Sequence, residues 1–114
     1  MSDCLFCRIL RREIAARVVF EDDAVLAFED INPQAPTHLL VIPRKHIAGL
    51  DEATPGDDAL LGRLQRVAAQ LAMERGIHAT GYRTVLNVGR QAGQSVFHLH
   101  QHLLGGRDLR WPPG

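Results

Sequence analysis

The sequence predicts an α+β fold in which about five mainly antiparallel strands carry one main helix on one face, with a short helix at the N-terminus. Three observations predict it. Short β-branched and apolar runs alternate with turn-forming residues, one long stretch has apolar residues at helical spacing, and the connections are short. The 114 residues suit a single domain over 1–114, because no repeat, low-complexity tract or linker divides them.

The N-terminal part predicts one short helix and three strands. Phe6 and Ile9 fall on one side of the helix, and Ser2 or Asp3 is the candidate cap. The last strand of this part is apolar and β-branched, which is typical of a buried strand. In chain order, the segments are a helix at 4–13, two strands within 17–30 around a turn at 21–23, a loop at 32–36 and a strand at 37–43.

The C-terminal part predicts the main helix and two further strands. Thr54 is its expected cap, Pro55 and Asp57 suit its first turn, and Gly76 is its expected end. In chain order, the remaining segments are a strand at 82–89, a loop at 89–93 and a last strand from Val96 to Leu104.

The overall composition argues against several classes of protein. Thirteen basic and thirteen acidic residues give a formal net charge of zero, so we expect no basic face for nucleic acid. No apolar run approaches the ~18 residues that cross a bilayer, and charged residues interrupt the N-terminus before any signal-peptide core. We therefore expect a soluble cytoplasmic protein that binds neither nucleic acid nor membrane.

Three histidines stand at every second position of the last predicted strand: His98, His100 and His102. Side chains alternate along a strand, so the three imidazoles are expected on one face, with the residues between them facing the core. A neutral imidazole is a good nucleophile when its second nitrogen donates to a fixed acceptor. The competing interpretation is a zinc site, since His-x-His on a strand also suits metal binding, although this segment supplies no carboxylate to orient the ligands.

Three further polar residues are candidates for the same site. His38 begins the strand at 37–43 and is expected to lie beside the last strand, where it would orient His98. Asn87 and Ser95 are candidate donors to an anionic group, and the alternative is that they serve turns and strand ends.

Longer motifs around these residues resemble a known family. The segment "QSVFHLHQHLLGGR" is similar to the signature of the histidine triad (HIT) family. The segments "LAFEDINPQAPTHLLVIPRKHI" and "GGRDLRWPPG" resemble its Hint branch, the purine nucleoside phosphoramidases. The resemblance runs from about Cys4 to the last residue. It implies a homodimer with paired five-stranded sheets and a nucleotide pocket on each protomer.

The resemblance also implies an activity and its residues. The activity is cleavage of purine nucleoside 5′-phosphoramidates or aminoacyl adenylates through a nucleotidyl-histidine intermediate, which releases the nucleoside monophosphate. His100 matches the nucleophile, and His98 and His38 match the residues that orient it. The groups that match contacts to the phosphate and leaving group are His102, Asn87 and Ser95.

The nucleoside contacts follow from the same resemblance. Asp30 matches the carboxylate that binds the ribose, and its two acceptors suit a vicinal diol, although capping the next loop is an equal alternative. Trp111 matches a tryptophan near the partner's active site. The residues that match the walls around the base, and that are otherwise core residues, are Phe6, Ile9, Phe28 and Ile31. A bend at Asp30 or Ile31 is needed to bring the last two into one pocket.

Two residues depart from the pattern of the family. Gln101 stands where an apolar residue is usual, and strand alternation points it away from the site, so we expect a local packing change with activity retained. Val88 follows Asn87 where polar residues are common, which bears on the leaving-group side.

The pair Cys4 and Cys7 is a weak signal by itself, open to metal binding, redox chemistry or two idle thiols. The resemblance implies a structural zinc bound by Cys4, Cys7, His46 and His98, as in bacterial-type relatives. The alternative is a pair of buried, metal-free thiols. His46 is otherwise a solvent-facing loop residue, and His78 is expected at the surface.

Four functions are therefore weighed. The leading one is a nucleotide hydrolase that needs no metal for catalysis. The others are a nucleotide-binding or scaffolding dimer with little turnover, a zinc-dependent hydrolase, and a dinucleoside polyphosphate hydrolase.

Overall fold

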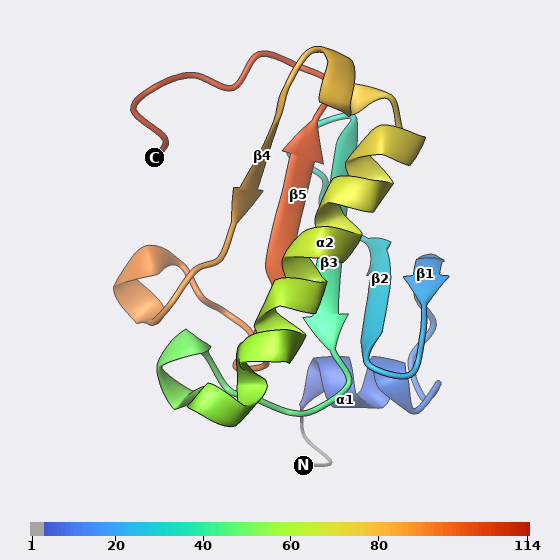
Figure 1. The fold of residues 1–114 in the computed structure, drawn as a ribbon, viewed down its shortest axis with the longest axis vertical. Coiled ribbons are helices and arrows are strands. Elements are labelled where there is room, and N and C mark those ends of the chain that lie inside the picture. The colour runs from blue at the N-terminus through green and yellow to red at the C-terminus, as the bar shows by residue number, and fades with distance from the viewer. Residues whose placement is uncertain (1–3) are drawn as a thin grey trace.

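The computed structural model describes residues 4–114 and builds them around one five-stranded antiparallel sheet, in the order β1-β2-β3-β5-β4 (Figure 1). The predicted α+β fold, with its main helix and short N-terminal helix, is confirmed. In chain order, the helices and strands are α1 (Leu5–Leu10), β1 (Val18–Glu21), β2 (Val25–Glu29), β3 (Thr37–Pro43), α2 (Asp58–Glu74), β4 (Tyr82–Val85) and β5 (Gln101–Gly105).

The main helix α2 begins and ends where the sequence predicts. A capping box joins Thr54 and Asp57, and a single 3-10 turn over Pro55–Asp57 leads into α2. Gly76 follows the helix with φ 74°, a left-handed conformation that favours glycine. Figure 1 shows α2 lying across one face of the sheet, where its apolar stripe forms the larger core with β2, β3 and β5.

The opposite face of the sheet carries α1 and a smaller apolar cluster. Alternation along β2 and β3 sends one set of side chains toward α2 and the other set toward α1. The second set joins two residues of α1, and the cluster consists of Phe6, Ile9, Leu26, Phe28, Leu40 and Ile42. The sheet is therefore buried on both faces at its centre, and the candidate site lies on the α1 side.

The predicted last strand is wrong in its first half. β5 begins at Gln101, so His98 and His100 precede the strand and only His102 lies in it. The segment before Gln101 is tethered elsewhere, because the Leu99 N–H donates to the carbonyl of Ile47 at 2.6 Å. Strand alternation therefore does not position all three imidazoles, although the residues between them are buried as expected, each 2% exposed or less.

Two other predicted segments are shorter in the structure. The helix expected over 4–13 ends at Leu10, and Arg12 has φ 62°. The strand expected over 82–89 ends at Val85. The expected cap at Ser2 or Asp3 lies outside the described residues, within which Cys4 caps α1 by accepting from the Cys7 N–H at 3.4 Å. In the described part of the chain, no helix has both the length and the apolarity to cross a membrane.

Candidate functional site

A cavity of about 400 Å³ opens on the α1 face of the sheet, between α1, the end of β2, the middle of β3 and the loop that precedes β5. Its lining brings together nine of the residues proposed from the sequence: Phe6, Ile9, Phe28, Asp30, Ile31, Asn87, Ser95, His100 and His102. The sequence analysis missed several neighbours on the same wall, namely Leu5, Ile14, Leu40, Gly93 and Val96. Leu5 and Leu40 are apolar residues of the kind that ordinarily form a core, so no sequence signal distinguishes them as cavity residues.

One end of this cavity is apolar. Phe6 of α1 and Phe28 of β2 pack edge to face with ring centroids 5.5 Å apart, and each is 4% exposed. β2 ends at Glu29 and the chain bends after it, so the predicted bend is present and Ile31 lies on the rim, 99% exposed. This end suits a flat apolar ring.

His100 is held in one proton arrangement by the backbone. Its Nδ1 lies 2.8 Å from the carbonyl oxygen of His98, and a carbonyl only accepts, so Nδ1 carries the proton. In the neutral imidazole, Nε2 then has a free lone pair. The ring is 8% exposed and lines the cavity, with the Phe6 ring edge-on to it at 5.1 Å. This arrangement suits an imidazole nucleophile.

His38 and His102 form a second fixed pair. The Gln34 backbone N–H donates to His38 Nδ1 at 3.0 Å, so Nε2 of the neutral His38 ring carries the proton. That Nε2 lies 2.9 Å from His102 Nδ1 and donates to it. The remaining nitrogen of His102, Nε2, is therefore an N–H donor.

Burial keeps this pair neutral at neutral pH. Burial, together with the nearby His100 and His38, lowers the pKa of His102 to about 4 against the opposing charge of Asp30. Burial also lowers the pKa of His38, and the Asp30 carboxylate opposes that change. The tautomers deduced from the hydrogen bonds thus apply at physiological pH.

The expected contact between His38 and His98 is wrong, because the structure pairs His38 with His102 instead. In the β3–β5 ladder, Leu40 is opposite His102 and His38 is opposite Leu104. His38 and His102 are therefore diagonal neighbours on the same face, within reach of each other. The register of two strands distant in sequence decides this contact.

Asp30 caps the following loop and also lines the cavity. Its Oδ1 accepts from the Asn32 backbone N–H at 2.8 Å, which caps the following loop. Its Oδ2 lies 3.4 Å from His38 Nε2, and the residue lines the cavity between the apolar end and the histidines. A carboxylate in that position suits the hydroxyl groups of a ribose.

The cysteine–histidine cluster consists of Cys4, Cys7, His46 and His98, none of which lines the cavity. The four potential ligand atoms all lie within 4.8 Å of one another. His98 Nδ1 is 3.5 Å and 3.6 Å from the sulfurs of Cys4 and Cys7. His46 Nδ1 is 3.3 Å from the Cys7 sulfur and 3.1 Å from His98 Nδ1.

These distances and the proton positions fit a tetrahedral metal ion. With Zn–N of about 2.0–2.1 Å and Zn–S of about 2.3 Å, tetrahedral ligands lie about 3.3–3.8 Å apart. His98 Nε2 donates to the carbonyl of Pro43 at 2.8 Å, which leaves the lone pair on Nδ1 facing the cluster. Burial lowers the pKa of His98 and so favours the neutral ligand form. Burial raises the pKa of the Cys7 thiol, with the Cys4 sulfur adding to the effect, so a bound cation must displace that proton.

A second grouping of possible ligands, Asp30, His38 and His102, does not fit a metal in the same way. Its ligand atoms are also within 4.8 Å of one another. A metal at His38 Nε2 would require the proton on Nδ1, where the Gln34 N–H already points. Two N–H donors would then face each other, so these residues suit hydrogen bonding with one another and not metal coordination.

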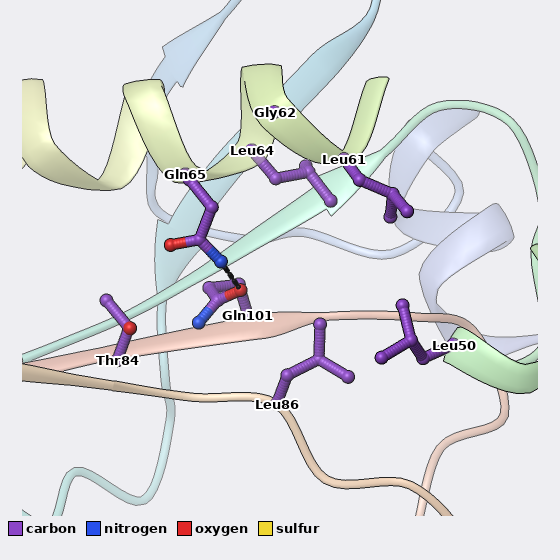
Figure 2. Close-up of a pocket in the computed structure, with 8 residues that line it drawn as sticks. All are labelled: Leu50, Leu61, Gly62, Leu64, Gln65, Thr84, Leu86 and Gln101. Atoms are coloured by element: carbon purple, nitrogen blue, oxygen red, sulfur yellow. Dashed lines mark hydrogen bonds between the residues drawn. The ribbon is translucent and has the colours of Figure 1, made fainter. Parts of the chain in front are cut away.

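Two other candidates lie away from the cavity. Trp111 is 82% exposed in the C-terminal segment and does not line the cavity of its own chain. Gln101 points to the α2 side as predicted, is 2% exposed and accepts from Gln65 Nε2 at 2.6 Å. Figure 2 shows this amide pair among the residues that line a second hollow, which also include Leu50, Leu61, Leu64 and Leu86. His78 is exposed, as expected.

Comparison with known proteins gives consistent matches. The model of the HIT domain family matches residues 11–109. An uncharacterised HIT-like protein of Synechococcus elongatus is 55% identical over 113 residues, which are 99% of this chain and 98% of that protein. The purine nucleoside phosphoramidase of Escherichia coli is 47% identical over 108 residues, which are 95% of this chain and 91% of that enzyme. The crystal structure of a HIT family hydrolase from Legionella pneumophila matches with a TM-score of 0.96 at 54% identity, covering 98% of this chain and 100% of that one.

Proposed function

The chain belongs to the HIT domain family, and from this premise we propose that it hydrolyses purine nucleoside 5′-phosphoramidates and aminoacyl adenylates. The product is the nucleoside monophosphate. The single observation that carries the proposal is the proton arrangement of His100, whose Nδ1–H is bound to the His98 carbonyl. Its Nε2 lone pair is thereby left for attack on the α-phosphorus.

The first chemical step joins His100 to phosphorus. The Nε2 lone pair forms the N–P bond while the bond from phosphorus to the leaving nitrogen or oxygen breaks. The leaving group needs a proton, and His102 Nε2–H supplies it. His102 then regains a proton at Nδ1 from His38 Nε2, because the two nitrogens are already hydrogen-bonded at 2.9 Å. Water next attacks the nucleotidyl-histidine, and the new O–P bond forms as the N–P bond to His100 breaks. The proton that the water loses passes to His102 Nε2, and His102 Nδ1 returns its proton to His38 Nε2 along the same hydrogen bond. The monophosphate is released, and His100, His102 and His38 regain their starting protons.

The rest of the cavity binds the nucleotide. The apolar end between Phe6, Ile9 and Phe28 holds the base, and Asp30 binds the ribose hydroxyls. Asn87 and Ser95 line the same cavity near the histidines, where their side chains can donate to phosphate oxygens. This assignment is supported by their joint presence in one cavity.

The cysteine–histidine cluster binds a structural Zn²⁺ ion in this proposal. Two thiolates and two imidazoles would close a tetrahedral site, and the ion supplies folding free energy by cross-linking the ligands. The cluster would then hold α1 against the segment that carries His98. No catalytic step needs the ion.

We also propose that the chain forms a homodimer through the β4 edge. β4 is the last strand of the sheet, and one side of its backbone has no neighbour within the described residues. Apolar side chains beside it form the hollow in Figure 2, which lies between α2 and β4. An apolar hollow next to an open strand suits strand pairing with a second copy. Sedimentation of Leu61→Arg, compared with the unaltered chain, tests this proposal: a monomer is expected, and an unchanged mass would refute it.

The activity is tested with adenosine 5′-phosphoramidate as substrate. His100→Ala is expected to reduce turnover by about 10³-fold or more, whereas His78→Ala, the same change at an exposed histidine, leaves it unchanged. Rapid acid quench of the unaltered chain should trap a nucleotide covalently bound to His100, seen by mass spectrometry. Turnover that survives His100→Ala, or binding of the monophosphate without hydrolysis, would overturn the proposal.

Chelation separates structural zinc from a zinc-dependent hydrolase. The metal-free protein should retain a measurable kcat at saturating substrate. A complete loss of kcat that zinc restores, in protein whose circular dichroism is unchanged, would favour catalytic zinc instead.

A further inference from the structure

We propose that Phe6 is a positioning residue that couples the cysteine–histidine cluster to the nucleotide cavity. Zn²⁺ in the cluster and a purine nucleoside monophosphate in the cavity then each raise the protein's affinity for the other. The inference rests on the proposed function, because it takes the ligand of the cavity to be a nucleotide. It assigns to α1 a role beyond forming a wall.

The helix α1 is shared by the two sites. Its N-cap Cys4 and its residue Cys7 belong to the cluster, while Leu5, Phe6 and Ile9 line the cavity. α1 has six residues, and isolated helices shorter than about 12–15 residues are marginal in water. Its position is therefore set by what its side chains contact on either side.

Phe6 stands between the two cysteines in sequence and touches both sites in space. Its ring is 4% exposed and packs edge-on to the ring of His98, with centroids 5.9 Å apart. The same ring packs edge-on to His100 at 5.1 Å and to Phe28 at 5.5 Å. A shift of α1 would therefore disturb a cluster ligand, the nucleophile and the base wall together.

His98 provides a second connection to the nucleophile. Its Nδ1 faces the cluster, and its backbone carbonyl accepts the proton of His100 Nδ1 at 2.8 Å. Fixing the His98 ring at the metal restricts the backbone that holds His100. The Phe6 ring packs edge-on to both imidazoles, so α1 and this backbone segment are expected to become ordered together.

Shared ordering has a thermodynamic consequence. The first ligand to bind orders α1, and the second ligand then binds a helix that is already in place. The effect must be equal in both directions, because the coupling free energy belongs to the pair of ligands. Couplings of this kind are typically about 5- to 150-fold, so we expect each ligand to tighten the other by about fivefold or more.

The experiment measures both directions on the unaltered chain. Isothermal titration calorimetry gives the dissociation constant of adenosine 5′-monophosphate for zinc-loaded and chelator-stripped protein. Competition with a chromophoric chelator gives the zinc dissociation constant with and without saturating monophosphate. The expected result is the same factor in both measurements.

The failures of the two proposals are distinguishable. Equal monophosphate affinity with and without zinc overturns the coupling and leaves the proposed function standing. No zinc binding overturns the coupling and the structural zinc site, and leaves the proposed hydrolysis standing. No monophosphate binding to either form overturns both.

Two matched variants locate the coupling. Phe6→Leu and Phe28→Leu each remove an aromatic wall of the same cavity, but only Phe6 packs against His98 and His100. Both variants should weaken monophosphate binding directly. Phe6→Leu should also bring the ratio of the two dissociation constants close to one, whereas Phe28→Leu should preserve the ratio of the unaltered chain. A preserved ratio in Phe6→Leu would refute the role of Phe6, and the reciprocity measurement decides the coupling if that variant fails to fold.

Discussion

Replacing His38 by leucine tests the proton arrangement on which the proposed chemistry depends. The change removes the acceptor for the Gln34 N–H and the donor to His102 Nδ1, which are held at 3.0 Å and 2.9 Å. His102 is then free to carry its proton on Nδ1, in which case Nε2 no longer donates to a leaving group. We expect a loss in kcat of about 10²-fold, the lower end of what a general acid contributes.

The expected loss of stability is smaller than the loss of rate. Each broken hydrogen bond is worth about 1 kcal/mol, and the exposed Gln34 can bind water instead. A destabilisation of about 1–2 kcal/mol is a fraction of the roughly 5–15 kcal/mol that folds a domain of this size. About 2.7 kcal/mol in the activation free energy therefore reports on chemistry and not on unfolding.

The matched variant is His38→Gln. The glutamine Nε2 occupies a place similar to the imidazole Nε2, so it retains the donor to His102 and should lose about tenfold or less in kcat. The assay is steady-state hydrolysis of adenosine 5′-phosphoramidate, with ¹⁵N NMR of the His102 ring reporting which nitrogen is protonated. Equal kcat losses in the two variants, or a proton on His102 Nδ1 in the unaltered chain, would refute the reasoning.

Three further predictions concern stability. The folded pKa of His102, about 4, lies below its ordinary value of 6.5, so its contribution to stability is complete above pH 6.5 and is lost as pH falls toward 4. The full pKa shift corresponds to about 3 kcal/mol of unfolding free energy, which partial exposure reduces to about 1–2 kcal/mol. Urea titrations at pH 7 and pH 4.5 should therefore show a larger loss of unfolding free energy for the unaltered chain than for His102→Asn, and an equal loss in the two proteins would contradict this. Gln101→Leu should leave kcat unchanged and keep the midpoint of thermal unfolding within a few degrees, because the partner Gln65 is exposed and regains water; a drop in kcat of tenfold would show that the α2 side of the sheet influences the site. Gly105→Ala should cost about 1–3 kcal/mol by urea titration, since a Cβ there would lie 2.6 Å from Ile77 Cδ1, and an unchanged midpoint would mean that the Ile77 turn moves freely.

Local sequence signals predicted most of the elements. The capping box at Thr54 and Asp57 and the stop at Gly76 depend on contacts within a few residues, so the bounds of α2 followed from the sequence. The turn between β1 and β2 was found in the same way. The last strand was not, because its first half is drawn out of the sheet by a bond from Leu99 to Ile47, which are far apart in the chain.

In the candidate site too, the sequence indicated the residue types, whereas contacts between distant segments came only from the structure. The histidines at every second position from His98 to His102 indicated an imidazole nucleophile, and the resemblance to the HIT family implied a nucleotide pocket beside them. The sequence did not indicate that His38 contacts His102, since that contact depends on the register of β3 against β5. It also did not indicate that the Phe6 ring packs against both His98 and His100.

Residue types and short-range spacing thus predicted which side chains are candidates for chemistry, and the resemblance to the HIT family supplied the proposed partners of the imidazoles, the carboxylate and the thiols. Only the tertiary structure decided which nitrogen of each imidazole holds the proton, because the partners are the carbonyls of His98 and Pro43 and the N–H of Gln34. A hydrogen bond selects a tautomer through direction and distance. Those quantities do not exist until the backbone is folded.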